Sequence, residues 1–265
     1  IRKEKNPIKK FLSDLFLELM PTCFLENLED IENLSNEVFP KNPKSIFTSN
    51  AFASDEVFKY WSASKTKKLI IGQHGCNYCT TKYKINPSVE EKIPKKFITW
   101  GLKNFNTHFS GINFLENKIN NIKVENNKVS LILYAQKGEY FFDEFFDFIS
   151  YQNFYSNFLK SFINKYKKYQ IIIKPHKTHK HNLINEIDFW TQNFSDIEFA
   201  NDADTVEDIV NKSFLTIFTY DSTDFFKALH RKKNIILLSH NNLEHIRDDV
   251  IENYNLLKNK LIFTN

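Results

Sequence analysis

The sequence predicts an α/β protein built from parallel sheets with helices on both faces. Short strands rich in β-branched and aromatic residues alternate with segments of helical length along most of the chain. Clusters of polar residues follow three of these strands directly, at the edge where parallel sheets bind ligands. With 265 residues, the chain can form one large domain or two small ones.

The first half begins with helix and continues as a β-α-β unit. Residues 7–36 carry apolar side chains at spacings of three and four, which predicts amphipathic helix broken around Pro21, and we expect this segment to pack. The next predicted elements are a strand at 45–49, a helix at 55–63, and strands at 68–72 and 96–101. No complete βαβ unit precedes Lys44 and the first residue is Ile1, so we expect the N-terminal lobe to be incomplete.

The second half repeats the alternation of strand and helix. The interval 104–127 is rich in Asn and Lys and predicts the connection between two lobes, which we place at 1–120 and 121–265. The strands that follow are predicted at 128–135, 170–174, 198–199, 215–219 and 234–238, with helices at 145–166, 183–194, 206–212, 223–229 and 243–257. This order predicts a doubly wound lobe.

Composition and missing motifs exclude several classes of protein. The net charge of +4 is too mild for a dedicated nucleic-acid binder, but it suits anionic small molecules or an anionic membrane surface. The longest apolar runs are far too short to span a bilayer, no signal peptide is visible, and three cysteines form no even disulfide framework. We therefore expect a cytoplasmic protein. Signatures of P-loop, dinucleotide-binding and α/β-hydrolase proteins do not occur.

The first polar cluster is Gly72-Gln73-His74-Gly75, which follows the strand at 68–72. Its glycines allow a tight turn and a close approach to a ligand, and His74 can donate to a phosphate or sugar hydroxyl or act as acid or base. A structural histidine at a strand end is the alternative. The nearby Cys76 and Cys79 form a single C-x-x-C, which is a weak signal for redox or metal chemistry.

The second cluster is Lys174-Pro175-His176, at the end of the strand at 170–174. A fixed cation beside an imidazole suits a nucleotide phosphate, and Pro175 presets the turn. His179 and His181 follow, but no carboxylate or cysteine completes a usual ligand spacing, so we expect no metal site.

The third cluster, residues 219–223, lies between a strand and a helix and contains Tyr220, Ser222 and Thr223. Its hydroxyls can serve simply as a helix cap. With the N–H groups of the helix start they can also bind phosphate. The carboxylate pairs Glu90-Glu91 and Asp143-Glu144 are either catalytic candidates or surface charge.

Five segments, in order along the chain, carry a resemblance to a known family: SIFTSNAFASDEVFKYW, LIIGQHGCNYCTTKY, EEKIPKKFITWG, IIIKPHK and TIFTYDSTDFFKALHRKKNIILL. Together they resemble bacterial surface-carbohydrate transferases related to retaining β-Kdo transferases, over roughly residues 45–238. The resemblance implies a GT-B fold of two Rossmann-like lobes. It also implies a donor in which CMP activates a 3-deoxy-ulosonic or nonulosonic acid, and a role in assembling lipopolysaccharide or capsule.

The resemblance assigns roles to individual residues. It implies that Lys174 and His176 grip the donor phosphate, with Ser222, Thr223 and the adjacent Tyr220 facing the same group. On the acceptor side it implies His74 and Glu90, beside Gln73 and Gly75. Cys76 and Cys79 stand where glycines are commoner in this family, and Lys177 replaces a second proline, which weakens the assignment of the exact donor.

These roles lead to the expected reaction. Either Asp143 acts as nucleophile in a retaining double displacement, or Glu90 acts as base in an inverting reaction. No cofactor or metal is implied, because the leaving group carries one phosphate. The expected partners are the nucleotide-sugar donor, a glycan or glycolipid acceptor and, peripherally, the inner face of the cytoplasmic membrane. The alternatives are a CDP-glycerol-type polyol-phosphate transferase and a non-catalytic α/β binding module.

Overall fold

The computed structural model describes residues 6–75, 78, 80–82, 85–101, 103, 106–111, 123–134, 148–177, 186–258 and 260–264. These residues form two compact units, each built around its own sheet. The first unit comprises residues 1–74, 89–99 and 105–110, and the second comprises residues 75–88, 100–104 and 111–265. Each unit is described separately below.

The first unit opens with two helices joined by a short 3-10 turn. The bounds are α1 Pro7–Leu19, η1 Thr22–Phe24 and α2 Leu28–Val38. The break falls around Pro21, as the sequence predicts, because the preceding residue, Met20, has extended backbone angles. Asn6 caps α1 by accepting hydrogen bonds from the backbone N–H groups of Ile8 and Lys9 at 2.9 and 3.3 Å.

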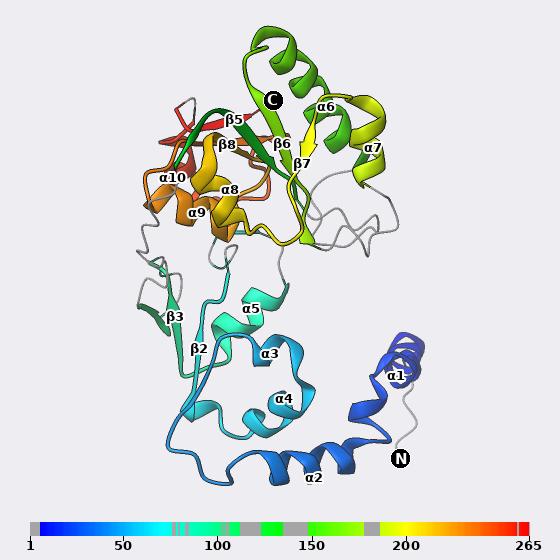
Figure 1. Ribbon diagram of the computed structural model, residues 1–265. Helices are drawn as coiled ribbons and strands as arrows, with labels where there is room; N and C mark the ends of the chain where they lie inside the picture. Colours follow the sequence, from blue (N-terminus) through cyan, green and yellow to red (C-terminus); the bar gives the residue numbers. More distant parts are fainter. Residues whose placement is uncertain are drawn as a thin grey trace. The chain divides into compact units, whose positions relative to one another are not determined.

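The sheet of the first unit has four parallel strands in the order β1-β2-β3-β4. Its strands are β1 Ile46–Thr48, β2 Leu69–Gly72, β3 Lys96–Thr99 and β4 His108–Ser110. Between the strands lie α3 Ala51–Ser54, α4 Glu56–Ala63, η2 Thr66–Lys68 and α5 Ile85–Lys92. Figure 1 labels β2 and β3 with the helices α3, α4 and α5 of this part of the chain.

The second unit has a six-stranded sheet in the order β10-β9-β8-β5-β6-β7, and every pairing is parallel. Its strands are β5 Glu125–Ile132, β6 Gln170–Lys174, β7 Glu198–Phe199, β8 Ser213–Phe218, β9 Ile235–Ser239 and β10 Ile262–Thr264. Its helices are α6 Phe148–Lys165, α7 Glu186–Asn193, α8 Val206–Lys212, α9 Thr223–His230 and α10 Ile251–Asn255.

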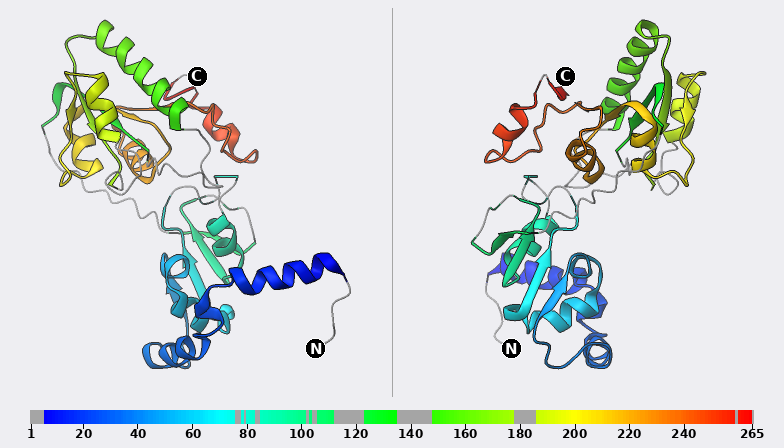
Figure 2. Two further views of the ribbon diagram at one scale, coloured as in Figure 1. Left: turned by 90° about the vertical axis from the view of Figure 1, so that its right-hand side faces the viewer. Right: turned by 60° about the vertical axis from the view of Figure 1, so that its left-hand side comes forward.

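Alternate residues of the central strand β5 face opposite layers of this unit. Val129 and Leu131 pack in one core with Tyr155 of α6 and Trp190 of α7. The next residue, Ile132, packs in a second core, together with residues of α8, α9 and α10 such as Val210, Phe225 and Tyr254. Helices therefore cover both faces of the larger sheet, as Figures 1 and 2 show.

These features confirm the predicted fold class: α/β, GT-B-like, with parallel sheets in two Rossmann-like units. When the strands of the second unit are numbered 1 to 6 along the chain, from β5 to β10, their order across the sheet from β7 to β10 is 3-2-1-4-5-6. This is the Rossmann arrangement. Most of the predicted elements lie within a few residues of the observed ones.

Two predicted intervals are wrong in part, and one strand was missed. The interval 104–127, predicted as a connection, contains the edge strand β4, and β5 already begins at Glu125. The predicted helix at 243–257 is reduced to α10. Asn242 and Leu243 have positive φ angles of 50° and 65°, and the residues from there to Val250 form turns apart from Ile246 and Arg247, of which Ile246 forms a β-bridge. Strand β10 was not predicted at all.

Among the described residues, no helix combines the length and the apolar character needed to cross a bilayer.

Candidate functional site

The candidate site of the second unit lies at the carboxyl ends of β5 and β8. The chain builds the sheet outward from β5 through β6 to β7, and then returns to the other side of β5 to form β8. Ligands of doubly wound sheets bind at this switch point. Tyr134 follows β5 here, and the turn of residues 219–223 follows β8.

A buried network of hydroxyl groups organises the switch point. The backbone N–H of Tyr134 donates to the hydroxyl oxygens of Tyr151 and Thr219, at 3.0 Å each, and these two hydroxyls are themselves 3.0 Å apart. Tyr155 donates to the carbonyls of Thr219 and Leu238 at 3.1 and 2.5 Å. Burial raises the pKa of both phenols, so they stay protonated and fix the ends of three strands.

The turn after β8 presents hydroxyl groups at the start of α9. Ser222 is the N-cap, and its side chain accepts a hydrogen bond from the N–H of Phe225 at 3.1 Å. The capping interpretation of this cluster is therefore correct, and a serine hydroxyl that accepts at a cap can still donate to a ligand. The ring of Tyr220 meets that of Tyr134 edge-on, with centroids 5.0 Å apart.

Asp221, in the same turn, is the centre of a polar chain that the sequence analysis did not single out. Its carboxylate accepts a hydrogen bond from the Tyr254 hydroxyl at 2.7 Å and lies 3.2 Å from Nε2 of His245. Nδ1 of His245 is 3.2 Å from the amide nitrogen of Asn241, and Asn241 accepts from Ser239 at 2.8 Å. The turn after β8 is thus tied to the loop after β9.

The segment that follows the first glycine cluster belongs to this unit as well. Thr81 forms an antiparallel bridge with Ile246. Two backbone hydrogen bonds flank the bridge: Lys82 N–H donates to the His245 carbonyl at 2.9 Å, and Arg247 N–H donates to the Thr80 carbonyl at 2.8 Å. A Cβ added to Gly75 would lie 3.8 Å from the Thr223 hydroxyl oxygen, an ordinary contact distance. Gly75, predicted on the acceptor side, therefore lies beside the start of α9.

Lys174 ends β6 at the same edge of the sheet, next to β5. Its side chain is buried, and its ammonium donates to the carbonyl of Asn201, after β7, at 2.8 Å. Burial lowers the pKa of Lys174, an effect opposed by the carboxylates of Asp202 and Asp204. An ammonium has three N–H donors, so this one contact leaves capacity for an anion. His176, two residues further on, is half-buried.

Glu186 is a second residue that the sequence analysis missed. It begins α7, and its side chain is only 1% exposed. Burial raises the pKa of its carboxyl to about 7, with the Trp190 indole opposing the shift. Within the described part of the chain, neither oxygen has a partner in regular hydrogen-bond geometry. The charge of Glu186 also raises the pKa of Tyr151, a member of the switch-point network.

The remaining predicted residues of the described chain lie in the first unit. His74 is exposed, whereas Gln73 is buried and its N–H donates to the Ile98 carbonyl at 2.8 Å. Glu90 and Glu91 are 2% and 3% exposed, so they are not surface charge. Gly72 ends β2 without a positive φ. Its lack of a side chain makes room for the Phe47 ring, which would lie 3.2 Å from a Cβ added to Gly72.

Several predicted residues fall outside the described part of the chain. These are Asp143 and Glu144, the two cysteines of the C-x-x-C, and the pair His179 and His181.

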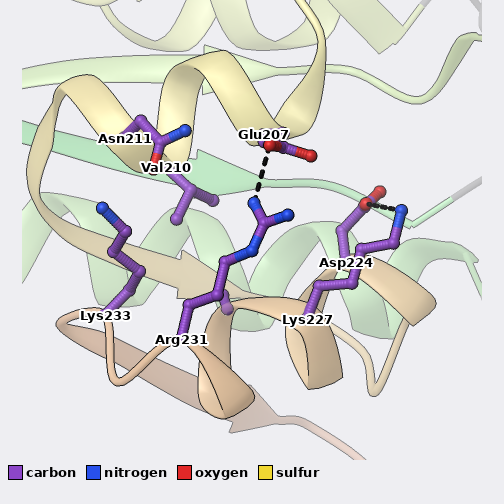
Figure 3. Close-up of a pocket in the computed structure, with 8 residues that line it drawn as sticks. Glu207, Val210, Asn211, Asp224, Lys227, Arg231 and Lys233 are labelled. Carbon is purple, nitrogen blue, oxygen red and sulfur yellow. Dashed lines mark ion pairs between the residues drawn. The ribbon is translucent and has the colours of Figure 1, made fainter. Parts of the chain in front are cut away.

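A separate depression lies between α8 and α9 (Figure 3). It is lined by Glu207, Val210, Asn211, Asp224, Lys227, Ala228, Arg231 and Lys233. Arg231 pairs with Glu207 at 2.6 Å and Lys227 with Asp224 at 3.7 Å, so carboxylates already neutralise two of its three cations. We therefore place the candidate site at the switch point.

The chain matches a known protein family. The model of a family described as "LIC12162 family transferase" matches residues 1–264. No curated protein matches the chain.

Proposed function

The chain belongs to the LIC12162 family of transferases, and from that premise we propose that it is a glycosyltransferase whose nucleotide-sugar donor binds at the carboxyl edge of the larger sheet. The observation that carries this proposal is the hydroxyl-bearing turn at the switch point. Ser222 and Thr223 begin an eight-residue helix there, between the ends of β5 and β8. Helix starts of this kind favour phosphate, since they offer N–H groups and the positive end of the helix dipole.

Cationic groups at the same edge of the sheet support an anionic ligand. Lys174 brings a positive charge into a buried position, where an electrostatic interaction with phosphate is stronger than in water. His176 lies two residues after Lys174 and is half-buried. As the donor bond breaks, negative charge develops on the departing phosphate, and fixed cations and N–H groups stabilise that charge.

The donor we propose is a CMP-activated 3-deoxy-ulosonic or nonulosonic acid, on the strength of the family resemblance of the five segments. In this reaction the bond from the anomeric carbon to the phosphate oxygen breaks and CMP leaves with the bonding electrons. A bond forms from the anomeric carbon to an acceptor hydroxyl of a surface glycan. In the inverting case Glu90 or His74 takes the hydroxyl proton. In the retaining case Asp143 first displaces CMP and forms a glycosyl ester; the acceptor hydroxyl then displaces Asp143 and gives its proton to the same base.

Two other functions predict different outcomes. A CDP-glycerol-type transferase would also bind a cytidine nucleotide, but with a preference for the diphosphate. A non-catalytic binding module would use the turn at Ser222 only as a cap, which is a role that its hydrogen bond to Phe225 already fills.

A thermal-shift screen of CMP, CDP, UDP, GDP and dTDP tests the proposal, because a ligand that binds only the native state raises the melting temperature. We expect CMP to give the largest shift, and His176→Ala to abolish it. The control is Lys177→Ala, which removes an exposed charge at the next position and should leave the shift intact. A dominant CDP shift would favour the polyol-phosphate enzyme, and no shift with any nucleotide would refute the transferase assignment of this edge.

A further inference from the structure

Helix α1 exposes a continuous apolar face. Five of the large side chains on it are between 55% and 71% exposed, namely Ile8, Phe11, Leu12, Phe16 and Leu19, while Leu15 among them is half-buried. At 100° per residue they fall within an arc of about 140°. The packing that the sequence predicts for this segment is therefore not present for these side chains, and the face requires a partner.

Local interactions at its first turn stabilise helix α1, in addition to the helical spacing of its apolar residues. Asn6 caps it, and Pro7 occupies the first turn, where a missing N–H costs nothing. Its 13 residues span about 20 Å, too short to cross a bilayer but suitable for lying along a surface.

Positive charge is concentrated at the start of this helix. Residues 1–10 contain five Lys or Arg and one Glu, a net charge of +4. The rest of the chain carries 31 cations and 31 anions, so this stretch accounts for the whole net charge of the protein. Two of the five cations, Lys9 and Lys10, lie on α1 itself and are exposed.

We propose that α1 binds in the plane of an anionic membrane, with the apolar face in the acyl boundary and the basic residues at the lipid headgroups. An amphipathic helix with aromatic and leucine side chains on one face and adjacent lysines binds such surfaces by apolar burial together with attraction to anionic lipid. A second copy of the chain is a poorer occupant, because it would add the same positive charge rather than neutralise it. This inference stands independently of the transferred sugar.

Vesicle co-sedimentation of the full chain tests the proposal, with phosphatidylcholine alone compared against phosphatidylcholine containing roughly 30% phosphatidylglycerol. We expect binding to the anionic vesicles, and roughly tenfold or greater weakening both in Phe11→Ser/Phe16→Ser and in Lys9→Glu/Lys10→Glu. The matched control is Leu256→Ser, since Leu256 is 72% exposed on another helix end and its loss should leave binding unchanged.

Each other outcome overturns the proposal. These outcomes are no sedimentation with anionic vesicles, equal sedimentation with both compositions, and loss of binding in the Leu256 control to the same extent. Light scattering tests whether a second copy of the chain covers this face instead. A dimer that dissociates in the double Phe variant would place α1 at a protein interface. All substituted side chains are exposed, so we expect the variants to fold. Circular dichroism spectra that match the natural protein would confirm this.

Discussion

Nε2 of His245 lies 3.2 Å from Oδ1 of Asp221, and this pair links the turn after β8 to the loop after β9. The same histidine offers its carbonyl to Lys82, a residue that is distant in sequence. One side chain and one backbone group of His245 therefore hold two loops at the carboxyl edge of the larger sheet. The turn that we propose as the phosphate site is anchored by Asp221, the residue immediately before Ser222.

Replacing Asp221 by Ala should destabilise the protein strongly. Asp221 is 4% exposed, and the variant would leave the Tyr254 hydroxyl and the His245 ring without their acceptor. We expect a loss on the order of 3 kcal/mol in the free energy of unfolding, measured by urea denaturation. Asp248→Ala is the control: its carboxylate is 93% exposed, and removing its ion pair with Lys82 should cost about 0.5 kcal/mol. Equal effects would contradict the buried network.

Glu186 should make stability depend on pH. Because its pKa is raised from 4.5 to about 7 in the folded state, the native protein binds the proton more tightly than the unfolded chain. The contribution of this group is fully present below pH 4.5 and is lost as the pH rises through 7, a change on the order of 3 kcal/mol. Glu186→Gln cannot ionise and should be more stable than the natural protein at pH 8 by about that amount.

The measurement is urea denaturation of both proteins at pH 5 and pH 8. Glu244→Gln, at an exposed position, should keep the pH dependence of the natural protein. Parallel pH profiles for the natural protein and the Glu186 variant would show that this carboxyl does not titrate in that range.

Ser222 should reveal its capping role through two substitutions. Ser222→Ala removes the acceptor of the Phe225 N–H and should cost about 1 kcal/mol. Ser222→Asn supplies another good N-cap and should retain nearly all of the stability. Thermal or urea unfolding measures both, and a similar loss in the two variants would mean that the site does not tolerate the larger side chain.

Tyr155→Phe should expose the contribution of the hydroxyl network. The variant leaves two buried carbonyls, those of Thr219 and Leu238, without this donor, at a cost of about 1 to 2 kcal/mol in the free energy of unfolding. Tyr166→Phe is the control, because Tyr166 is 41% exposed and water can solvate its hydroxyl. If the two variants were equally stable by urea denaturation, Tyr155 would not hold the strand ends.

The elements that sequence reasoning misses are those defined by their neighbours. β4 and β10 are three-residue strands at sheet edges, and each becomes a strand through its pairing with one neighbour, β3 or β9. Residues 243–250 have helical composition, but His245 and Ile246 pair instead with the segment around Thr81. Tertiary contacts override local propensity at such positions.

By itself, the sequence determines the alternation of strands and helices, because the period of apolar residues reflects which side chains must be buried. It also places Lys174, Ser222 and Thr223 at strand ends, since polar clusters stand directly after apolar runs. Only the tertiary structure decides that Asp221 meets His245, that Glu186 is buried, and that the apolar face of α1 is exposed. These facts depend on which distant segments meet in space, and a side chain's hydrogen bonds, protonation and solvent exposure follow from those neighbours rather than from its position in the chain.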